Sequence, residues 1–190
     1  MILSNVEILK AIEHQHFNIS PLAGSDPTKA PFNTSAVDLR LGPQLSVFKE
    51  NIPAAFDLRK PGIANFLHAN SDKFTISEDQ PYTLRKGKLV LGQTIEKVSF
   101  PLSDQGKCYS ARVEGKSSLA RCGIIVHFTA PTIHAGFTGP ITLEIMNLGP
   151  IDFMLYPGMF FCQLIVEEVC GRPAEAPNQF SGQVNPSGTK

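Results

Sequence analysis

Short apolar runs separated by turn-forming residues recur along most of this chain of 190 residues. Strict alternation of apolar and polar side chains, as in Val37-Asp38-Leu39-Arg40-Leu41, predicts strands, and turn residues every ten to eighteen positions or so are typical of a sandwich or barrel. No alternation of strands with helices is visible, so we expect a mainly β fold without a parallel sheet. The expected strands contain residues 37–41, 45–47, 74–76, 89–91, 94–98, 109–113, 123–129, 141–147, 153–156 and 160–166.

The two ends of the chain depart from this pattern. Ser4 precedes apolar residues at helical spacing and Glu7 follows three positions later, which is typical of a capping box. We therefore expect a short helix that ends near His14. From Gly171 onward the chain is polar and rich in proline and glycine, which predicts a mobile tail or a lid that orders on a ligand. We expect one domain over residues 1–170 and a tail over residues 171–190.

The composition of the chain indicates which kinds of partner it can bind. The chain has 17 basic and 17 acidic residues, and this balance lacks the basic excess that binding to nucleic acid or anionic membranes requires. Its apolar runs are far shorter than the ~20 residues that span a bilayer, and no signal-like segment opens the sequence, so we expect a cytoplasmic protein. The four cysteines form no C-x-x-C pair, which favours buried free thiols over a zinc site or disulfides.

Residues 114–121 could hold a phosphate group. Gly115 allows a sharp turn, Ser117 or Ser118 could cap a helical turn, and Lys116 and Arg121 supply positive charge. A plain serine cap flanked by two solvated cations explains the same residues. Spacing alone leaves both interpretations open.

The strand expected at residues 141–147 carries a carboxylate. Ile141, Leu143 and Ile145 would share one face, which places Thr142 and Glu144 on the other. Glu144 could be a solvated strand residue, or it could face a pocket where burial tunes it for proton transfer. Periodicity does not choose between them.

Taken in order, several segments resemble the dCTP deaminase branch of the trimeric dUTPase-like superfamily. The branch is indicated by Thr142-Leu143-Glu144, because deaminases of this family carry a carboxylate where dUTPases usually have none. The resemblance implies a distorted jelly-roll-like β-barrel with a short N-terminal helix, assembled as a homotrimer with shared active sites. The similar segments are residues 2–4, 35–42, 115–121, 139–147, 157–159 and 179–183.

The resemblance also implies a reaction, the hydrolysis of dCTP to dUTP and ammonia. Glu144 would take a proton from the water that attacks C4 of cytosine and then pass protons to N3 and the departing amine. Ser117 and the carbonyl of Ala130 would position the water and the amino group, and Arg121 would stabilise developing negative charge. No zinc is implied, in agreement with the absence of an H-x-E motif followed by P-C-x-x-C.

By the same resemblance, further residues would bind the nucleotide, and Mg2+ would bridge the oxygens of its triphosphate. The expected ligands are deoxynucleotides such as dCTP, dUTP and dTTP, with no nucleic acid and no membrane as partner. The implied substrate-binding residues are Lys116, Ser118, Leu119, Ala120, Ile133, His134, Thr142, Leu143, Gln163, Gln179, Phe180 and Gln183.

Three residues differ from the family pattern. His134 replaces an aspartate, Lys116 replaces an arginine and Gln179 replaces a lysine. Two alternatives stay open beside the deaminase. One is a bifunctional enzyme that also hydrolyses dUTP, which His134 makes less favoured, and the other is a nucleotide-binding relative without turnover, which His134 and Gln179 favour. His127 is expected to be a hydrogen-bonded core histidine, with a role in ligand binding as the alternative. Gln163 either lies near the nucleotide or bonds to neighbouring backbone.

Overall fold

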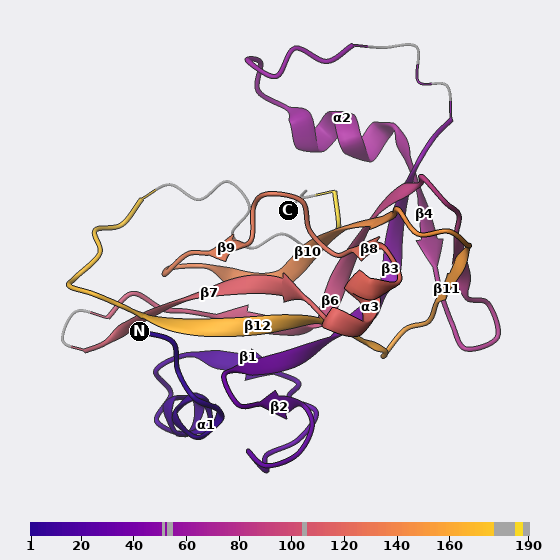
Figure 1. Cartoon of the computed structure of the whole chain (residues 1–190). Helices are drawn as coiled ribbons and strands as arrows, with labels where there is room; N and C mark the ends of the chain where they lie inside the picture. Colours follow the sequence, from indigo (N-terminus) through magenta and orange to yellow (C-terminus); the bar gives the residue numbers. More distant parts are fainter. Residues whose placement is uncertain (51, 53–54, 104–105, 177–184, 188–190) are drawn as a thin grey trace.

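The computed structural model of the chain describes residues 1–50, 52, 55–103, 106–176 and 185–187. Among these residues, ten strands form one curled antiparallel sheet with the path β8-β10-β6-β3-β12-β7-β9, while β11 and β5 form a separate pair (Figure 1). The elements are α1 (Asn5–Glu13), β1 (Asn18–Ser20), β2 (Phe32–Asn33), β3 (Ala36–Phe48), α2 (Ile63–Ala69), β4 (Ser71–Thr75), β5 (Tyr82–Leu84), β6 (Leu89–Ser99), β7 (Cys108–Gly115), α3 (Ser117–Arg121), β8 (Ile124–Ile125), β9 (Thr132–Ile133), β10 (Thr138–Asn147), β11 (Phe153–Leu155) and β12 (Phe160–Val169).

The predicted β class and N-terminal helix are confirmed. The side chain of Ser4 accepts a hydrogen bond from the backbone N–H of Glu7 at 3.3 Å, and α1 ends at Glu13 with His14 as its cap. The Glu7 carboxylate pairs with Lys10 at 2.8 Å. Ile8 is fully buried, so the helix contributes its apolar face to the core.

Two pairs of predicted strands are each one long strand. Residues 37–41 and 45–47 both belong to β3, and residues 89–91 and 94–98 both belong to β6. Gly42-Pro43 resembled a turn in the sequence, but it lies at an irregularity where the register between β3 and β6 shifts. At Gly92 the core is closely packed, because a Cβ there would lie 3.0 Å from the side chain of Ile145.

Side chains of β3, β10 and β12 meet in the core. Alternate residues of β3 point inward, and the same alternation puts apolar residues of β10 and β12 against them. The predicted strand at residues 123–129 is shorter than expected, since only Ile124–Ile125 pair with β10. The fully buried members of this core include Val37, Leu39, Leu41, Leu143, Ile145, Phe161, Leu164 and Val166.

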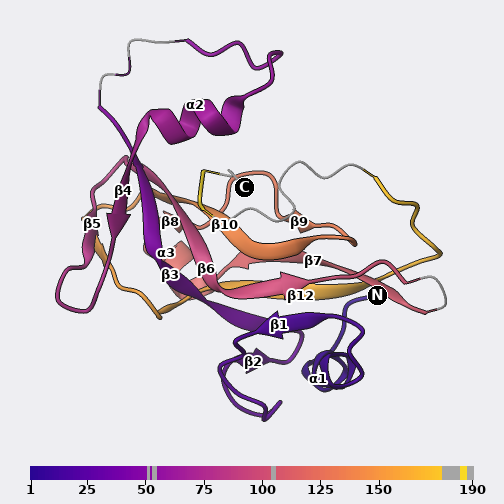
Figure 2. The ribbon, with the colours of Figure 1, turned by 180° about the vertical axis from the view of Figure 1, so that it is seen from behind.

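The connection between β3 and β4 contains a helix that the sequence analysis did not predict. Figures 1 and 2 show α2 standing away from the sheet, and residues 185–187 lie between α2 and the sheet. The Phe56 and Phe66 rings pack with centroids 4.9 Å apart. His68, in the last turn of α2, contacts Ser187, whose hydroxyl lies 3.2 Å from Nδ1.

The four cysteines are free, as expected, but only two are buried. Cys108 and Cys162 lie in β7 and β12, whereas Cys122 caps α3 and Cys170 follows the end of β12, where both are exposed. The expectation of buried thiols is therefore wrong for Cys122 and Cys170. Burial raises the pKa of the Cys162 thiol far above its ordinary value, and the carboxylates of Glu96 and Asp38 raise it further.

None of the helices that the structure describes is long and apolar enough to cross a membrane.

Candidate functional site

A pocket of about 850 Å³ contains five of the residues predicted to meet the substrate. It is bordered by β6, β7, β9 and β10, by the chain after β8, by Leu67 of α2 and by parts of the C-terminal segment. The walls are mostly apolar with a few polar groups, as is common in small-molecule sites. The predicted residues in its lining are Ala130, Ile133, His134, Thr142 and Glu144.

Glu144 faces this pocket because of the period of β10. Leu143 and Ile145 are fully buried in the core, so the side chain of Glu144 leaves the opposite face of the strand. Its Oε2 accepts a hydrogen bond from the backbone N–H of Phe128 at 3.4 Å. Glu144 lines the pocket and is partly exposed there, so its carboxylate is open both to solvent and to a ligand in the pocket.

Two polar atoms near Glu144 have no hydrogen-bond partner among the described residues. They are Thr142 Oγ1 and His127 Nδ1, which are both buried. The expectation that His127 is a hydrogen-bonded core histidine is therefore wrong. Its ring lines the pocket, and its Nε2 lies 3.9 Å from Glu114 Oε2, beyond hydrogen-bond distance.

His134 lines the pocket from the turn between β9 and β10. Its side chain is exposed, and its backbone carbonyl accepts a hydrogen bond from Phe137 at 3.1 Å. Gly136, with a φ of 91°, closes this turn. The neighbouring Ile133 is buried and pairs with Ala111 of β7, which holds the turn against the sheet.

The helix that carries the predicted phosphate-binding residues is short. α3 comprises Ser117–Arg121, and the residue at its N-cap is Lys116, which makes no side-chain cap. The expectation of a serine cap is therefore wrong, because Ser117 and Ser118 are already the first helical residues. Ser117, Ser118, Ala120 and Arg121 are exposed, and Leu119 packs partly against the core.

Asp38 organises the side chains next to α3. Its carboxylate forms an ion pair with Lys116 and accepts hydrogen bonds from Asn33 at 2.8 Å and Gln163 at 3.1 Å. The Lys116 ammonium also lies 5.9 Å from the centre of the Phe160 ring. Gln163 thus bonds to a side chain and not to neighbouring backbone. Asp38 was not predicted as a site residue, because in the sequence it is only the polar position of an alternating strand.

The predicted site is divided between two regions of the chain. None of the predicted residues of α3 lines the pocket of Glu144. α3 follows the end of β7 and packs on β8 (Figure 1). A single copy therefore does not bring the two halves together.

The C-terminal segment is described in part. Pro173, Ala174 and Ala176 line the pocket, as do Pro186 and Ser187, and Ser187 is only 2% exposed. The predicted residues Gln179, Phe180 and Gln183 lie outside the described residues. The division into a domain of residues 1–170 and a tail stays a prediction.

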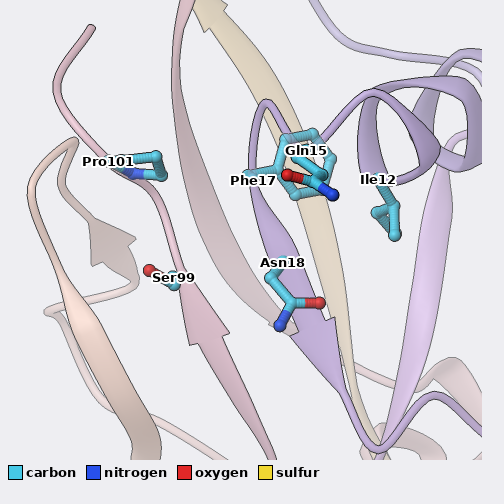
Figure 3. Close-up of a pocket in the computed structure, with 6 residues that line it drawn as sticks. All are labelled: Ile12, Gln15, Phe17, Asn18, Ser99 and Pro101. Carbon is cyan, nitrogen blue, oxygen red and sulfur yellow. The ribbon is translucent and has the colours of Figure 1, made fainter.

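A second cavity of about 410 Å³ lies between the end of α1, β1 and the end of β6 (Figure 3). Figure 3 shows the side chains of Gln15, Asn18 and Ser99 around it, with no charged group among the residues drawn. It contains none of the predicted site residues and no proton-transfer group. Within the described chain, no three His, Cys, Asp or Glu side chains gather as they would around a metal ion.

Comparisons with known proteins match nearly the whole chain. The model of a family described as dCTP deaminase-like matches residues 2–169. The "dCTP deaminase, dUMP-forming" of Dictyoglomus turgidum is 38% identical over 196 residues, covering 100% of this chain and 94% of that protein. The "dCTP deaminase" of Haloarcula marismortui is 35% identical, covering 100% and 94%. The crystal structure of 2'-deoxycytidine 5'-triphosphate deaminase from Agrobacterium tumefaciens superposes with a TM-score of 0.64 at 21% identity, covering 87% of this chain and 47% of that one.

Proposed function

The chain belongs to the dCTP deaminase-like family. We propose that it hydrolyses the bond between C4 of the cytosine ring and the amino group of dCTP, giving dUTP and ammonia. The position of Glu144 in a mostly apolar pocket supports this proposal most directly, because the reaction needs a group that moves protons beside the ring. The names of similar proteins from Dictyoglomus turgidum and Haloarcula marismortui point to the same substrate.

In the proposed reaction, Glu144 accepts a proton from a water molecule as its oxygen bonds to C4 of cytosine. The proton is passed to N3, and a second transfer to the amino group lets the C4–N bond break, so that ammonia leaves and a carbonyl remains. The carbonyl of Ala130 would orient the water. Ser117 and Arg121 would come from a neighbouring copy, because within one chain they do not reach the pocket. A homotrimer with composite sites meets this requirement.

The triphosphate would lie along α3, near Lys116, Ser118 and the neighbouring backbone. Because the protein offers no cluster of carboxylates in its described part, we assign Mg2+ to the phosphate oxygens of the nucleotide, where it would offset their charge. Lys116 already pairs with Asp38, so its contribution to phosphate binding is reduced. Ile133, His134, Thr142 and Leu143 would border the base and the sugar.

The first prediction concerns Glu144→Gln. The purified protein with dCTP and Mg2+ should release ammonia, and this variant should lower kcat by ~10²–10⁴-fold, since an amide cannot carry the proton. Products are identified by chromatography and ammonia by a coupled assay. Glu167→Gln, a carboxylate on β12 outside the pocket, is the matched control and should keep wild-type activity. A wild-type protein that binds dCTP without releasing ammonia would refute the catalytic role and favour a binding protein without turnover.

A second candidate is a bifunctional enzyme that goes on to dUMP and diphosphate. It is favoured by the names of relatives, since the proteins from Dictyoglomus turgidum, Dictyoglomus thermophilum and Methanosphaera stadtmanae are each called "dCTP deaminase, dUMP-forming". His134 opposes it, because a histidine is no permanent anion at neutral pH. The same chromatogram decides between them: dUMP with diphosphate supports this candidate, and dUTP as the end product excludes it.

A further inference from the structure

Asp38 binds the side chain of the residue from which α3 starts. Lys116 is the N-cap of α3, and its backbone carbonyl accepts a helical hydrogen bond from the N–H of Ala120 at 2.9 Å. The side chain of Lys116 does not cap the helix and forms an ion pair with the carboxylate of Asp38 in β3. The two residues are 78 positions apart, so this pair fastens the start of α3 to a distant strand.

The carboxylate of Asp38 is itself held in place. Its side chain is 11% exposed, and Oδ1 accepts hydrogen bonds from Asn33 of β2 at 2.8 Å and from Gln163 of β12 at 3.1 Å. The backbone N–H of Asp38 donates to the carbonyl of Pro31 at 2.8 Å. A carboxylate that is bonded through both oxygens in a largely buried network is a rigid partner. Lys116 is therefore bound to a fixed point of the sheet.

The two ends of α3 are held in different ways. At the C-terminal end, the backbone of Cys122 and Gly123 packs against the loop after β10. None of the five residues of α3 is buried, and Leu119 packs only partly against the core. Because isolated helices this short are unstable, α3 depends on contacts with the rest of the protein. The pair of Asp38 with Lys116 supplies such a contact at the N-terminal end.

We propose that Asp38 is a positioning residue for deamination, which acts through Lys116 by holding the first turn of α3 in place. This inference rests on the proposed function, in which Ser117 and Arg121 reach the ring bound by a neighbouring copy. Groups of an active site have to be held to within about 0.5 Å, so a loosened α3 lowers the rate. Lys116 serves here as an anchor, and Asp38 neutralises its charge.

Steady-state kinetics of the purified full-length protein with dCTP and Mg2+ test this proposal. Asp38→Asn and Lys116→Met should each lower kcat by roughly 10–100-fold, since a misplacement of about 1 Å can cost that much. The double variant should be no slower than the slower single variant, because both substitutions remove the same contact. Lys116→Arg keeps a cation that pairs with carboxylates and should retain most of the wild-type rate.

Arg40→Leu is the matched control, because it breaks another ion pair of β3, the one with Glu96. It should lower the midpoint of thermal unfolding and leave kcat of the folded protein within about twofold, which separates a loss of position from a loss of stability. Thermal unfolding and sedimentation show whether each variant is folded and assembled. If Asp38→Asn does not fold, the comparison of Lys116→Met with Lys116→Arg decides.

An Asp38→Asn protein that binds dCTP more tightly would overturn the proposal, because Lys116 would then be a phosphate ligand that the carboxylate withholds. A wild-type kcat in either single variant, or losses that multiply in the double variant, would overturn it as well. In these cases the wild-type protein still releases ammonia and the proposed function stands. If the wild-type protein releases none, the proposed function and this inference fail together.

Discussion

Two buried carboxylates, Asp38 and Glu96, each hold a cation at a defined place. Glu96 is 1% exposed and accepts bonds from the Arg40 backbone N–H at 2.8 Å and from Nε at 2.6 Å. Arg40 also donates to the carbonyl of Pro21 at 3.1 Å, which ties a loop to the sheet. Asp38 holds Lys116 and Gln163, two residues predicted to bind the substrate. Asp38 of β3 thus fixes the side chains of Lys116 and Gln163, which belong to the candidate site.

We expect loss of the Arg40–Glu96 ion pair to destabilise the protein strongly. Arg40→Leu leaves a buried carboxylate without its cation, which should lower the free energy of unfolding by ~3 kcal/mol. Urea unfolding followed by circular dichroism measures it. Lys10→Ala breaks an ion pair of similar length whose side chains are about half exposed, and it should cost under ~0.5 kcal/mol. Equal losses in the two variants would contradict the structural role of Glu96.

At the scale of elements, α3 is held by backbone packing. A Cβ at Gly149 would lie 2.1 Å from the carbonyl oxygen of Cys122, and the N–H of Leu148 bonds to the carbonyl of Gly123 at 2.8 Å. The buried side chain of Asn147 fixes this loop by accepting from Gly149 at 2.8 Å. The loop after β10 therefore packs closely against the backbone at the C-terminal end of α3.

This packing predicts that Gly149→Ala displaces α3. The variant should lose ~1–3 kcal/mol of stability through overpacking against backbone that cannot move freely, and deaminase activity should fall as well. Chemical denaturation and ammonia release are measured together. Gly115→Ala is the matched control at the other flank of α3, where a Cβ would meet only Val126 at 3.6 Å. A fully active and stable Gly149→Ala protein would show that this close approach is unimportant.

At the scale of the whole molecule, the separation of α3 from the pocket of Glu144 decides whether one copy of the chain can form the proposed active site. The pocket borders β9 and β10, while α3 packs on β8, so an active site that uses both needs a second copy. The division is a property of the chain's topology, and substitution within a single copy does not remove it.

A composite site predicts complementation between inactive variants. Glu144→Gln and Arg121→Ala should each be inactive, and their co-expressed mixture should regain about one quarter of wild-type activity in a symmetric trimer. The fraction follows because a working interface needs an intact Glu144 from one copy and an intact Arg121 from the next, each with a chance of about one half. Sedimentation should give three times the mass of the chain. A mixture that stays inactive would place both residues in one chain's site.

Much of the fold and part of the site could be predicted from local sequence. The alternation in residues 141–147 placed Glu144 opposite Leu143 and Ile145, and Ser4 with Glu7 placed the first helix, because both depend on neighbours a few positions away. Helix α2 and the short strands β1, β2, β5 and β9 were not predicted, since their segments are too short for a clear period.

The sequence by itself therefore determined the β class, the faces of the strands and the resemblance that singles out Glu144. Only the tertiary structure decided that Gly42 and Gly92 lie within strands, that Lys116 pairs with Asp38, and that Nδ1 of His127 is buried without a hydrogen-bond partner among the described residues. The physical reason is separation along the chain. Lys116 and Asp38 are 78 residues apart, and no local pattern of charge or hydropathy records which distant side chains the folded sheet brings together.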